Sequence, residues 1–194
     1  MARLLLIFTL ILYAATPATA DASDFDIRLA HGSARERLAE KQLRRLLDAH
    51  DVSPYIVTYS VRIDQNGAPH SHPVLTLNDF YIGDDASALS VFIHEQFHWL
   101  GTITGPAVNA AIEDLKNAFP TPPSQSQGGA PGDYATYVHL IVGTQEYLAT
   151  SSLFSKQEAR RVIAEKTWYT WVYRQVLEKE ETLLAILQKH GLAP

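Results

Sequence analysis

Five consecutive residues, His94-Glu95-Gln96-Phe97-His98, form an HExxH pattern, the set of residue types that metal-dependent hydrolysis needs on one helix. Positions four apart lie one above the other on a helix, so His94 and His98 can converge on a single Zn²⁺. Glu95 is rotated by about 100° from His94, which suits a general base for metal-bound water better than a third ligand. We therefore predict a zinc site with His94 and His98 as ligands and Glu95 as the base.

The residues around this pattern predict the helix that it requires. Asp84 and Asp85 are candidate N-caps, the run from Ala86 to Ile93 is mostly apolar, and Gly101 stands where a helix C-cap is expected. The alternative, two ordinary histidines on a half-buried helix, does not account for this placement.

A third zinc ligand has to come from elsewhere, because a catalytic zinc keeps three protein ligands and one water. The chain has no cysteine, which leaves His, Asp or Glu. The predicted helix from Asp133 to about Ser151 offers His139 and Glu146. They share one helical face but lie about 10.5 Å apart along the axis. One of them should be the ligand and the other should face the cleft, and spacing alone leaves the choice open.

The HExxH helix followed by a later helix carrying Glu146 resembles the gluzincin branch of the zincin metallopeptidases. The segment Glu146-Tyr147-Leu148-Ala149-Thr150 is similar to the Glu-x-x-Ala-Asp segment of several gluzincin families. The resemblance covers two helices and implies that Glu146 is the third ligand. His139 would then donate a hydrogen bond to the oxyanion of the reaction. The metzincin pattern is less similar, because no third histidine follows His98 six residues on.

The match departs from the family pattern at Thr150, where an aspartate is expected. That aspartate would orient a ligand imidazole from behind. Asp133 and Glu113 are candidate replacements, and the sequence does not choose between them. Other residues have less specific roles: Tyr137 is a second candidate oxyanion donor but better suits a core position. His70 and His72 are read as loop residues rather than a second metal site, and a packing role is expected for Trp168, Tyr169, Trp171 and Tyr173.

Residues 1–20 have the pattern of a signal peptide, with Arg3, an apolar stretch and the small-residue site Ala18-Thr19-Ala20. Such a signal peptide would direct the chain to the periplasm or the medium and would be cleaved before Asp21. An uncleaved anchor is the alternative. The lack of cysteine agrees with a protein stabilised by its core alone. No later run is long enough to predict membrane insertion.

The formal net charge is −5, and no basic run marks a nucleic-acid surface. Residues 21–194 suit a single domain. Its predicted elements are helices at 34–50, 106–118 and 133–151, strands at 55–63 and 73–77, one or two helices from Ser155 to His190, and a Pro- and Gly-rich loop at 120–132.

Together these patterns predict an α+β, zincin-like domain with a small sheet before the HExxH helix and a mostly helical C-terminal half. The expected function is a secreted or periplasmic zinc peptidase acting on peptide or protein substrates, and the resemblance implies that an edge strand at 73–77 or 79–83 pairs with the substrate. The alternative is a catalytically silent zincin-fold binding or envelope-assembly protein with a structural metal. The intact Glu95 favours the enzyme, because a structural site has no use for a base.

Overall fold

The computed structural model describes residues 21–194, so the predicted signal peptide lies outside the described residues. The chain is α+β and mostly helical, as expected. Its helices are α1 (Ala34–Ala49), α2 (Asp85–Ile103), α3 (Gly105–Ala118), α4 (Asp133–Leu153), α5 (Lys156–Ala164), α6 (Thr170–Glu178) and α7 (Glu180–Lys189). Strands β1 (Asp26–Leu29), β2 (Ser60–Ile63) and β3 (Leu75–Leu77) form one parallel sheet in the order β1-β2-β3.

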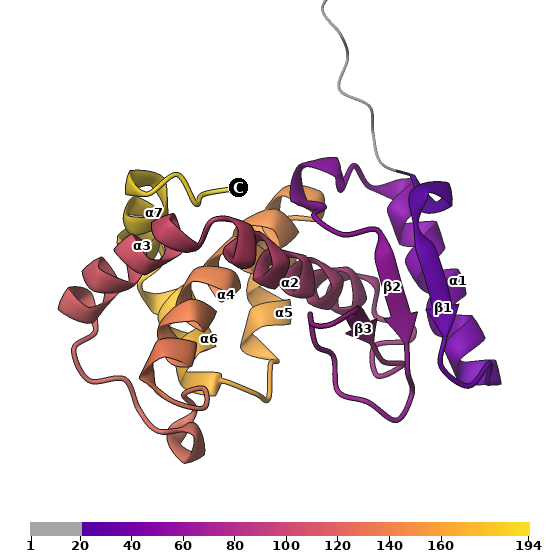
Figure 1. Ribbon diagram of the computed structural model, residues 1–194, viewed down its shortest axis with the longest axis horizontal. Helices are drawn as coiled ribbons and strands as arrows, with labels where there is room; N and C mark the ends of the chain where they lie inside the picture. The colour runs from indigo at the N-terminus through magenta and orange to yellow at the C-terminus, as the bar shows by residue number, and fades with distance from the viewer. Residues whose placement is uncertain (1–20) are drawn as a thin grey trace, which may run out of the picture.

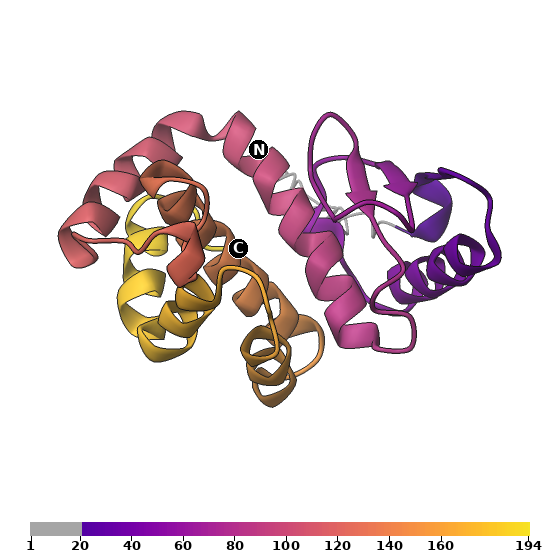
Figure 2. The same ribbon diagram turned by 90° about the horizontal axis from the view of Figure 1, so that it is seen from below.

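Helix α2 runs through the middle of the molecule and separates two groups of elements (Figures 1 and 2). The sheet and α1 lie on one side, and α4 with the remaining C-terminal helices lies on the other. Apolar side chains of α1, the sheet and α2 form one core, and those of α3 to α7 form a second. Helix α4 contributes to both cores, so the two sides are joined along the packed pair α2 and α4.

Helix α1 begins at the predicted capping box. The Ser33 hydroxyl accepts a hydrogen bond from the Glu36 backbone N–H, and the Glu36 carboxylate accepts one from the Ser33 N–H. Leu43, Leu46 and Leu47 are buried on one face of this helix, as their spacing predicts. This confirms the helix predicted for residues 34–50 to within one residue.

The strand predicted for residues 55–63 is wrong in its first half. Only Ser60–Ile63 pairs with its neighbours, while Tyr55 ends a short 3-10 helix at Ser53–Tyr55. The reason is a buried side chain of α2: Gln96 accepts the backbone N–H groups of Val57 and Thr58 and donates to the Thr58 carbonyl. One amide side chain therefore takes the place of a strand partner.

Helix α2 starts at the predicted N-cap but does not end at Gly101. The Asp84 carboxylate accepts the Ser87 backbone N–H, and the helix continues to Ile103 with Thr104 as its C-cap. Gly101 stays helical because Thr104 satisfies the end of the helix, its hydroxyl donating to the Leu100 carbonyl. The next helix follows at once with Pro106 in its first turn, as predicted.

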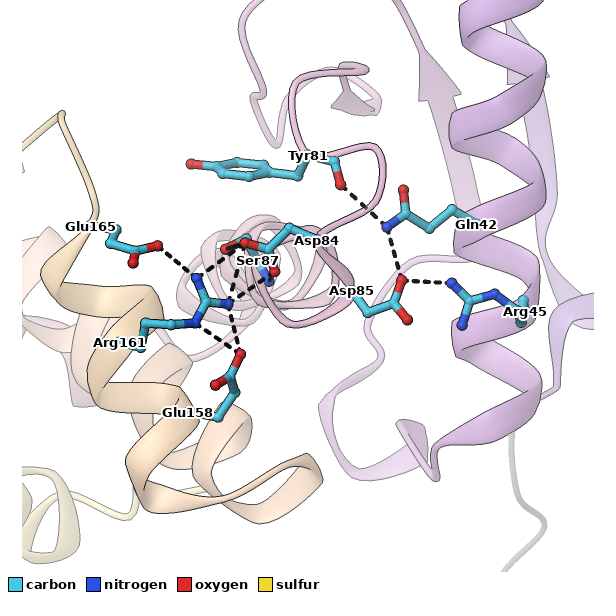
Figure 3. Close-up of polar contacts among 9 residues, drawn as sticks. All are labelled: Gln42, Arg45, Tyr81, Asp84, Asp85, Ser87, Glu158, Arg161 and Glu165. Carbon is cyan, nitrogen blue, oxygen red and sulfur yellow. Dashed lines mark hydrogen bonds and ion pairs between the residues drawn. The ribbon is translucent and has the colours of Figure 1, made fainter.

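Polar contacts fix the N-terminal end of α2 to both sides of the molecule (Figure 3). On one side the Arg161 guanidinium of α5 lies 3.0 Å from the Asp84 carboxylate. On the other, the Arg45 guanidinium of α1 lies 2.6 Å from the Asp85 carboxylate. The start of the helix that carries the HExxH pattern is therefore held from two directions.

The C-terminal part contains α5, α6 and α7, whereas the sequence predicted one or two helices. Ser155 caps α5 as expected, accepting the Glu158 N–H. The predicted break at Gly191 is confirmed, with φ at 66°. Gly129 in the predicted loop packs so tightly that an added Cβ would lie 2.1 Å from a backbone oxygen, which explains why the loop is partly buried there. Within residues 21–194, no helix has the length and apolar character to cross a bilayer.

Candidate metal centre

Three histidine side chains converge where α2 crosses α4. His94 and His98 come from α2 and His139 from α4, and each offers a ring nitrogen within 4.8 Å of the other two. The Nε2 atoms of His94 and His98 are 3.2 Å apart. Two nitrogens bound to a tetrahedral zinc at 2.0–2.1 Å would lie about 3.3 Å apart. The spacing of the pair therefore fits one shared metal ion.

The rings of two of these histidines are neutral, which leaves lone pairs free for a metal. Burial lowers the pKa of His98 to about 2, and the neighbouring imidazoles add to this effect. Burial likewise lowers the pKa of His139 to about 4. The His139 Nδ1 atom lies 2.7 Å from the Ala135 carbonyl, to which it donates. Its Nε2 atom is then the acceptor, as metal ligation requires.

Glu146 lies behind His94 and not among the three imidazoles. Its Oε2 atom is 2.8 Å from His94 Nδ1, the ring nitrogen other than the one near His98. A carboxylate in this position fixes the tautomer and orientation of a ligand imidazole. The geometry therefore favours His139 as the third ligand and Glu146 as the carboxylate that orients His94. These roles are the reverse of those predicted from the resemblance.

Every lone-pair direction of the Glu146 carboxylate is used. Oε1 accepts from the Ser90 hydroxyl and lies 2.8 Å from Lys166 Nζ, while Oε2 accepts from His94 and from the Tyr173 hydroxyl at 2.9 Å. Burial alone would raise the pKa of this carboxyl, but Lys166 and His94 outweigh it and hold the pKa well below its usual range. Glu146 is therefore a charged, fully occupied group with no oxygen left for a metal.

The same contact acts on His94. Burial alone would lower the pKa of its imidazole, but the Glu146 carboxylate outweighs burial and raises it. Tyr173 also lies 3.3 Å from the same ring nitrogen. Burial raises the pKa of the Tyr173 hydroxyl well above its usual value, so it stays a hydrogen-bond donor.

Glu95 is the acidic residue without hydrogen-bonded partners in this region. It is buried beside His94, and none of residues 21–194 donates a hydrogen bond to its carboxylate. Burial raises the pKa of Glu95, and His94 partly offsets that rise. A buried carboxylate with raised pKa and no fixed donor is suited to accept and release a proton.

Tyr169 lies against the third imidazole. Its ring centre is 4.2 Å from that of His139. Its backbone has φ at 53°, in the left-handed region that bulky residues rarely adopt. Burial raises the pKa of its hydroxyl, and the nearby Glu95 adds to the rise. Strained backbone at such a place is a feature of functional sites.

The expected replacements for the missing aspartate are not found near the site. Asp133 is exposed in the first turn of α4, and Glu113 pairs with Lys116 on the surface. Thr150 is buried, and its Oγ1 atom has no partner among the described residues. The carboxylate that orients an imidazole is Glu146 itself.

The predictions for the remaining aromatic residues and histidines are confirmed in part. Tyr137 is a core residue whose hydroxyl donates to the Phe119 carbonyl, so it is not an oxyanion donor. His72 stacks on Trp99 with ring centres 4.1 Å apart, and His70 bonds to a backbone carbonyl, as loop residues do. A packing role was expected for Tyr169 and Tyr173, which lie against His139 and Glu146, and for Trp168, which is exposed instead.

A second group of possible ligands, His31, Glu36 and Asp64, lies near the start of α1. The Glu36 carboxylate there accepts backbone N–H groups of the capping region, including that of His31 at 2.9 Å. His31 Nε2 lies 3.2 Å from Asp64. These contacts serve the turn that begins the helix, so the group is explained without a metal.

The open edge of the sheet is not free where it was expected to be. The backbone of Thr76 in β3 exchanges two hydrogen bonds with His70, in an antiparallel bridge. The segment that ends at His72 therefore covers β3, and the Trp99 indole of α2 donates to the Ser71 carbonyl within it. A substrate strand would have to pair with this covering segment rather than with residues 73–77.

A cavity of about 270 Å³ adjoins His98, one of the three imidazoles. Besides His98, the cavity is lined by other residues in the C-terminal half of α2, by residues of α3 and α4, by the loop residues Ser71 and His72, and by Leu192. The site thus consists of a histidine cluster, a nearby carboxylate and a hollow beside them. Comparison of the chain with protein-family models, with curated proteins and with solved structures gave no match.

Proposed function

We propose that this protein is a secreted or periplasmic zinc-dependent peptidase. The observation that carries the proposal is the convergence of His94, His98 and His139 beside Glu95, a carboxylate with no hydrogen-bond donor among residues 21–194. A purely structural zinc site is closed by a fourth protein ligand, whereas a catalytic one keeps three and a water. Three imidazoles and an adjacent base match the second kind.

The donor set supports zinc in particular. Imidazole nitrogens suit Zn²⁺, and a thiolate site is ruled out because the chain has no cysteine. His94, His98 and His139 would hold the ion, with Glu146 orienting His94 from behind. Zinc bound there would supply a Lewis acid that lowers the pKa of its water to about 7.

Two residues beside the three ligands then have a role in hydrolysis. Glu95 takes the proton from the attacking water and passes it to the leaving amine as the peptide bond breaks. The Tyr169 ring packs against His139, and its hydroxyl, near Glu95, donates a hydrogen bond to the carbonyl oxygen as negative charge develops on that oxygen. In this proposal Tyr169 takes the role that the resemblance had given to His139.

The order of elements supports the resemblance to zincins. A small sheet precedes the HExxH helix and a later helix supplies the remaining site residues. The resemblance to gluzincins in particular is weaker, because Glu146 stands behind His94 and a histidine takes the ligand position. We therefore propose a zincin-like peptidase with three histidine ligands.

The test is hydrolysis of a complex peptide mixture by the zinc-loaded protein, with zinc content measured on the same sample. The control is Glu95→Gln, which removes the base and leaves the three histidines in place. We expect cleavage by the wild type, loss on chelation, and loss in the Glu95→Gln protein despite one bound zinc. Equal behaviour of the two zinc-loaded proteins would contradict a peptidase and favour the silent protein with a structural metal.

A further inference from the structure

Gln145 is a buried side chain of α4 with an unused hydrogen-bond acceptor. It is 2% exposed, and its Nε2 atom donates to the Leu192 carbonyl at 2.7 Å. That bond assigns the two ends of the carboxamide, because only the NH₂ group can donate to a carbonyl. The remaining atom, Oε1, accepts no hydrogen bond from residues 21–194.

This acceptor is reached from the cavity beside His98. Gln145 is one of the residues that line the cavity. Among residues 21–194, the fully enclosed side-chain polar atom without a partner is Thr150 Oγ1, so Gln145 Oε1 is not sealed off. Water can donate to an acceptor that is reached from a cavity, so an occupant that displaces water without bringing a donor would lose about 1–3 kcal/mol. An occupant that brings a donor to it would gain affinity.

The other residues that line the cavity determine the polarity and charge of the group that it can bind. Its walls include the apolar side chains of Phe97, Val108, Ile141, Val142 and Leu192. None of the residues that line it in the described chain is acidic, so a lysine or arginine side chain would have no charge partner. A small polar side chain would leave the apolar walls uncovered.

We propose that the cavity binds the side chain of a substrate residue with an apolar ring and a hydrogen-bond donor at its tip, and that tyrosine is this residue. The phenol ring would cover the apolar walls and its hydroxyl would donate to Gln145 Oε1. This names a substrate class for the proposed peptidase and rests on that function for its biological meaning. His98 lines the cavity, so a tyrosine bound there would lie next to one of the three imidazoles.

The binding test uses p-cresol as a probe for the tyrosine side chain and toluene as a probe for phenylalanine, each titrated into the metal-free protein of residues 21–194. Binding is followed by NMR at the Gln145 side-chain amide and at the surrounding backbone. We expect p-cresol to bind more tightly than toluene by about 3- to 10-fold, which corresponds to one neutral hydrogen bond.

Three variants separate the hydrogen bond from the shape of the cavity. Gln145→Met should remove the preference for p-cresol and leave toluene binding in place. Gly101→Leu should abolish binding of both probes, because an added Cβ meets only a Val108 methyl at 4.0 Å and the larger side chain fills the hollow. Gln188→Met, at an exposed position of α7, is the matched control and should behave as the wild type.

The same preference should hold in catalysis. With zinc, peptides that differ only by tyrosine or phenylalanine should show a ratio of kcat/KM of about 3 to 10, and Gln145→Met should bring the ratio near one. Equal binding of p-cresol and toluene, or a preference that survives Gln145→Met, would overturn the proposal. Since the probe titrations need no metal, failure there leaves the zinc peptidase standing, and failure of zinc binding leaves the cavity result standing.

Discussion

Replacing Lys166 by methionine tests whether the group behind His94 is a true buried ion pair. Lys166 Nζ lies 2.8 Å from Glu146, and the two side chains are 8% and 0% exposed. Lys166 comes from the segment between α5 and α6, and its ammonium lies 5.7 Å from the ring centre of Tyr81 and 5.8 Å from that of Tyr173. Methionine keeps an unbranched apolar side chain and removes the charge.

The expected loss follows from the burial of both partners. Without Lys166 the buried Glu146 charge keeps only His94 as an ionic partner, and removing one member of a buried pair costs up to about 3–5 kcal/mol. The variant Lys166→Met should therefore lower the free energy of unfolding by that amount. Adding Glu146→Gln removes the stranded charge while keeping polar atoms for Ser90 and Tyr173. The double variant should be more stable than Lys166→Met alone, with a coupling energy of at least about 2 kcal/mol.

The assay is urea unfolding of the four metal-free proteins of this double-mutant cycle. A matched control comes from Lys156, which also lies 2.8 Å from a carboxylate, that of Glu180, but has a side chain 64% exposed. Lys156→Met should cost no more than about 1 kcal/mol. If the effects of Lys166→Met and Glu146→Gln add to within about 0.5 kcal/mol, the two groups are not coupled and the reasoning is refuted.

The remaining predictions concern metal, turnover, stability and export. His139→Ala should lower zinc affinity by orders of magnitude, whereas Glu146→Gln should lower it by about 10–100-fold with one zinc retained at saturation; equal losses in calorimetry would contradict the assigned roles. Tyr169→Phe should lower kcat about 10²-fold, and an unchanged kcat would remove its oxyanion role. Asp84→Ala should cost about 1–2 kcal/mol in unfolding and Asp84→Asn less, because asparagine still caps. Burial alone would raise the pKa of Asp84, but Arg161 outweighs burial and lowers it. The wild type should therefore be more stable than Asp84→Asn above pH about 4, and this difference should vanish as the pH falls below that value. A difference in stability that does not change with pH would contradict this. The N-terminal sequence of the exported protein should begin at Asp21, and a sequence that begins at Met1 would contradict cleavage.

Local signals predicted the helices well. The caps at Ser33, Asp84 and Ser155 each depend on residues within one turn, so the sequence contains all the information that they need. The strands were predicted less well, because Gln96 of α2 replaces a strand partner for residues 57 and 58. Strand β1 was missed, since its four residues alternate without a strong apolar pattern.

For the site too, roles that depend on local spacing could be predicted and roles that depend on helix packing could not. The spacing of His94 and His98 on one helix is local and could be predicted. The roles of His139 and Glu146 depend on how α4 is placed against α2, which no local pattern determines. The two helices cross in opposite directions, so His139 comes level with His98 while Glu146 reaches the far side of His94. Tyr169 and Lys166 come from a connection between helices, where periodicity gives no signal.

The central claim is that three imidazoles hold one zinc and leave a position open. X-ray absorption at the zinc edge of the metal-loaded protein measures this directly, because imidazole ligands give a characteristic outer-shell signal. We expect three imidazole nitrogens and one oxygen at about 2.0–2.1 Å, with one imidazole fewer in the His139→Ala protein. A spectrum with two imidazoles and a carboxylate in the wild type, unchanged by His139→Ala, would contradict the claim.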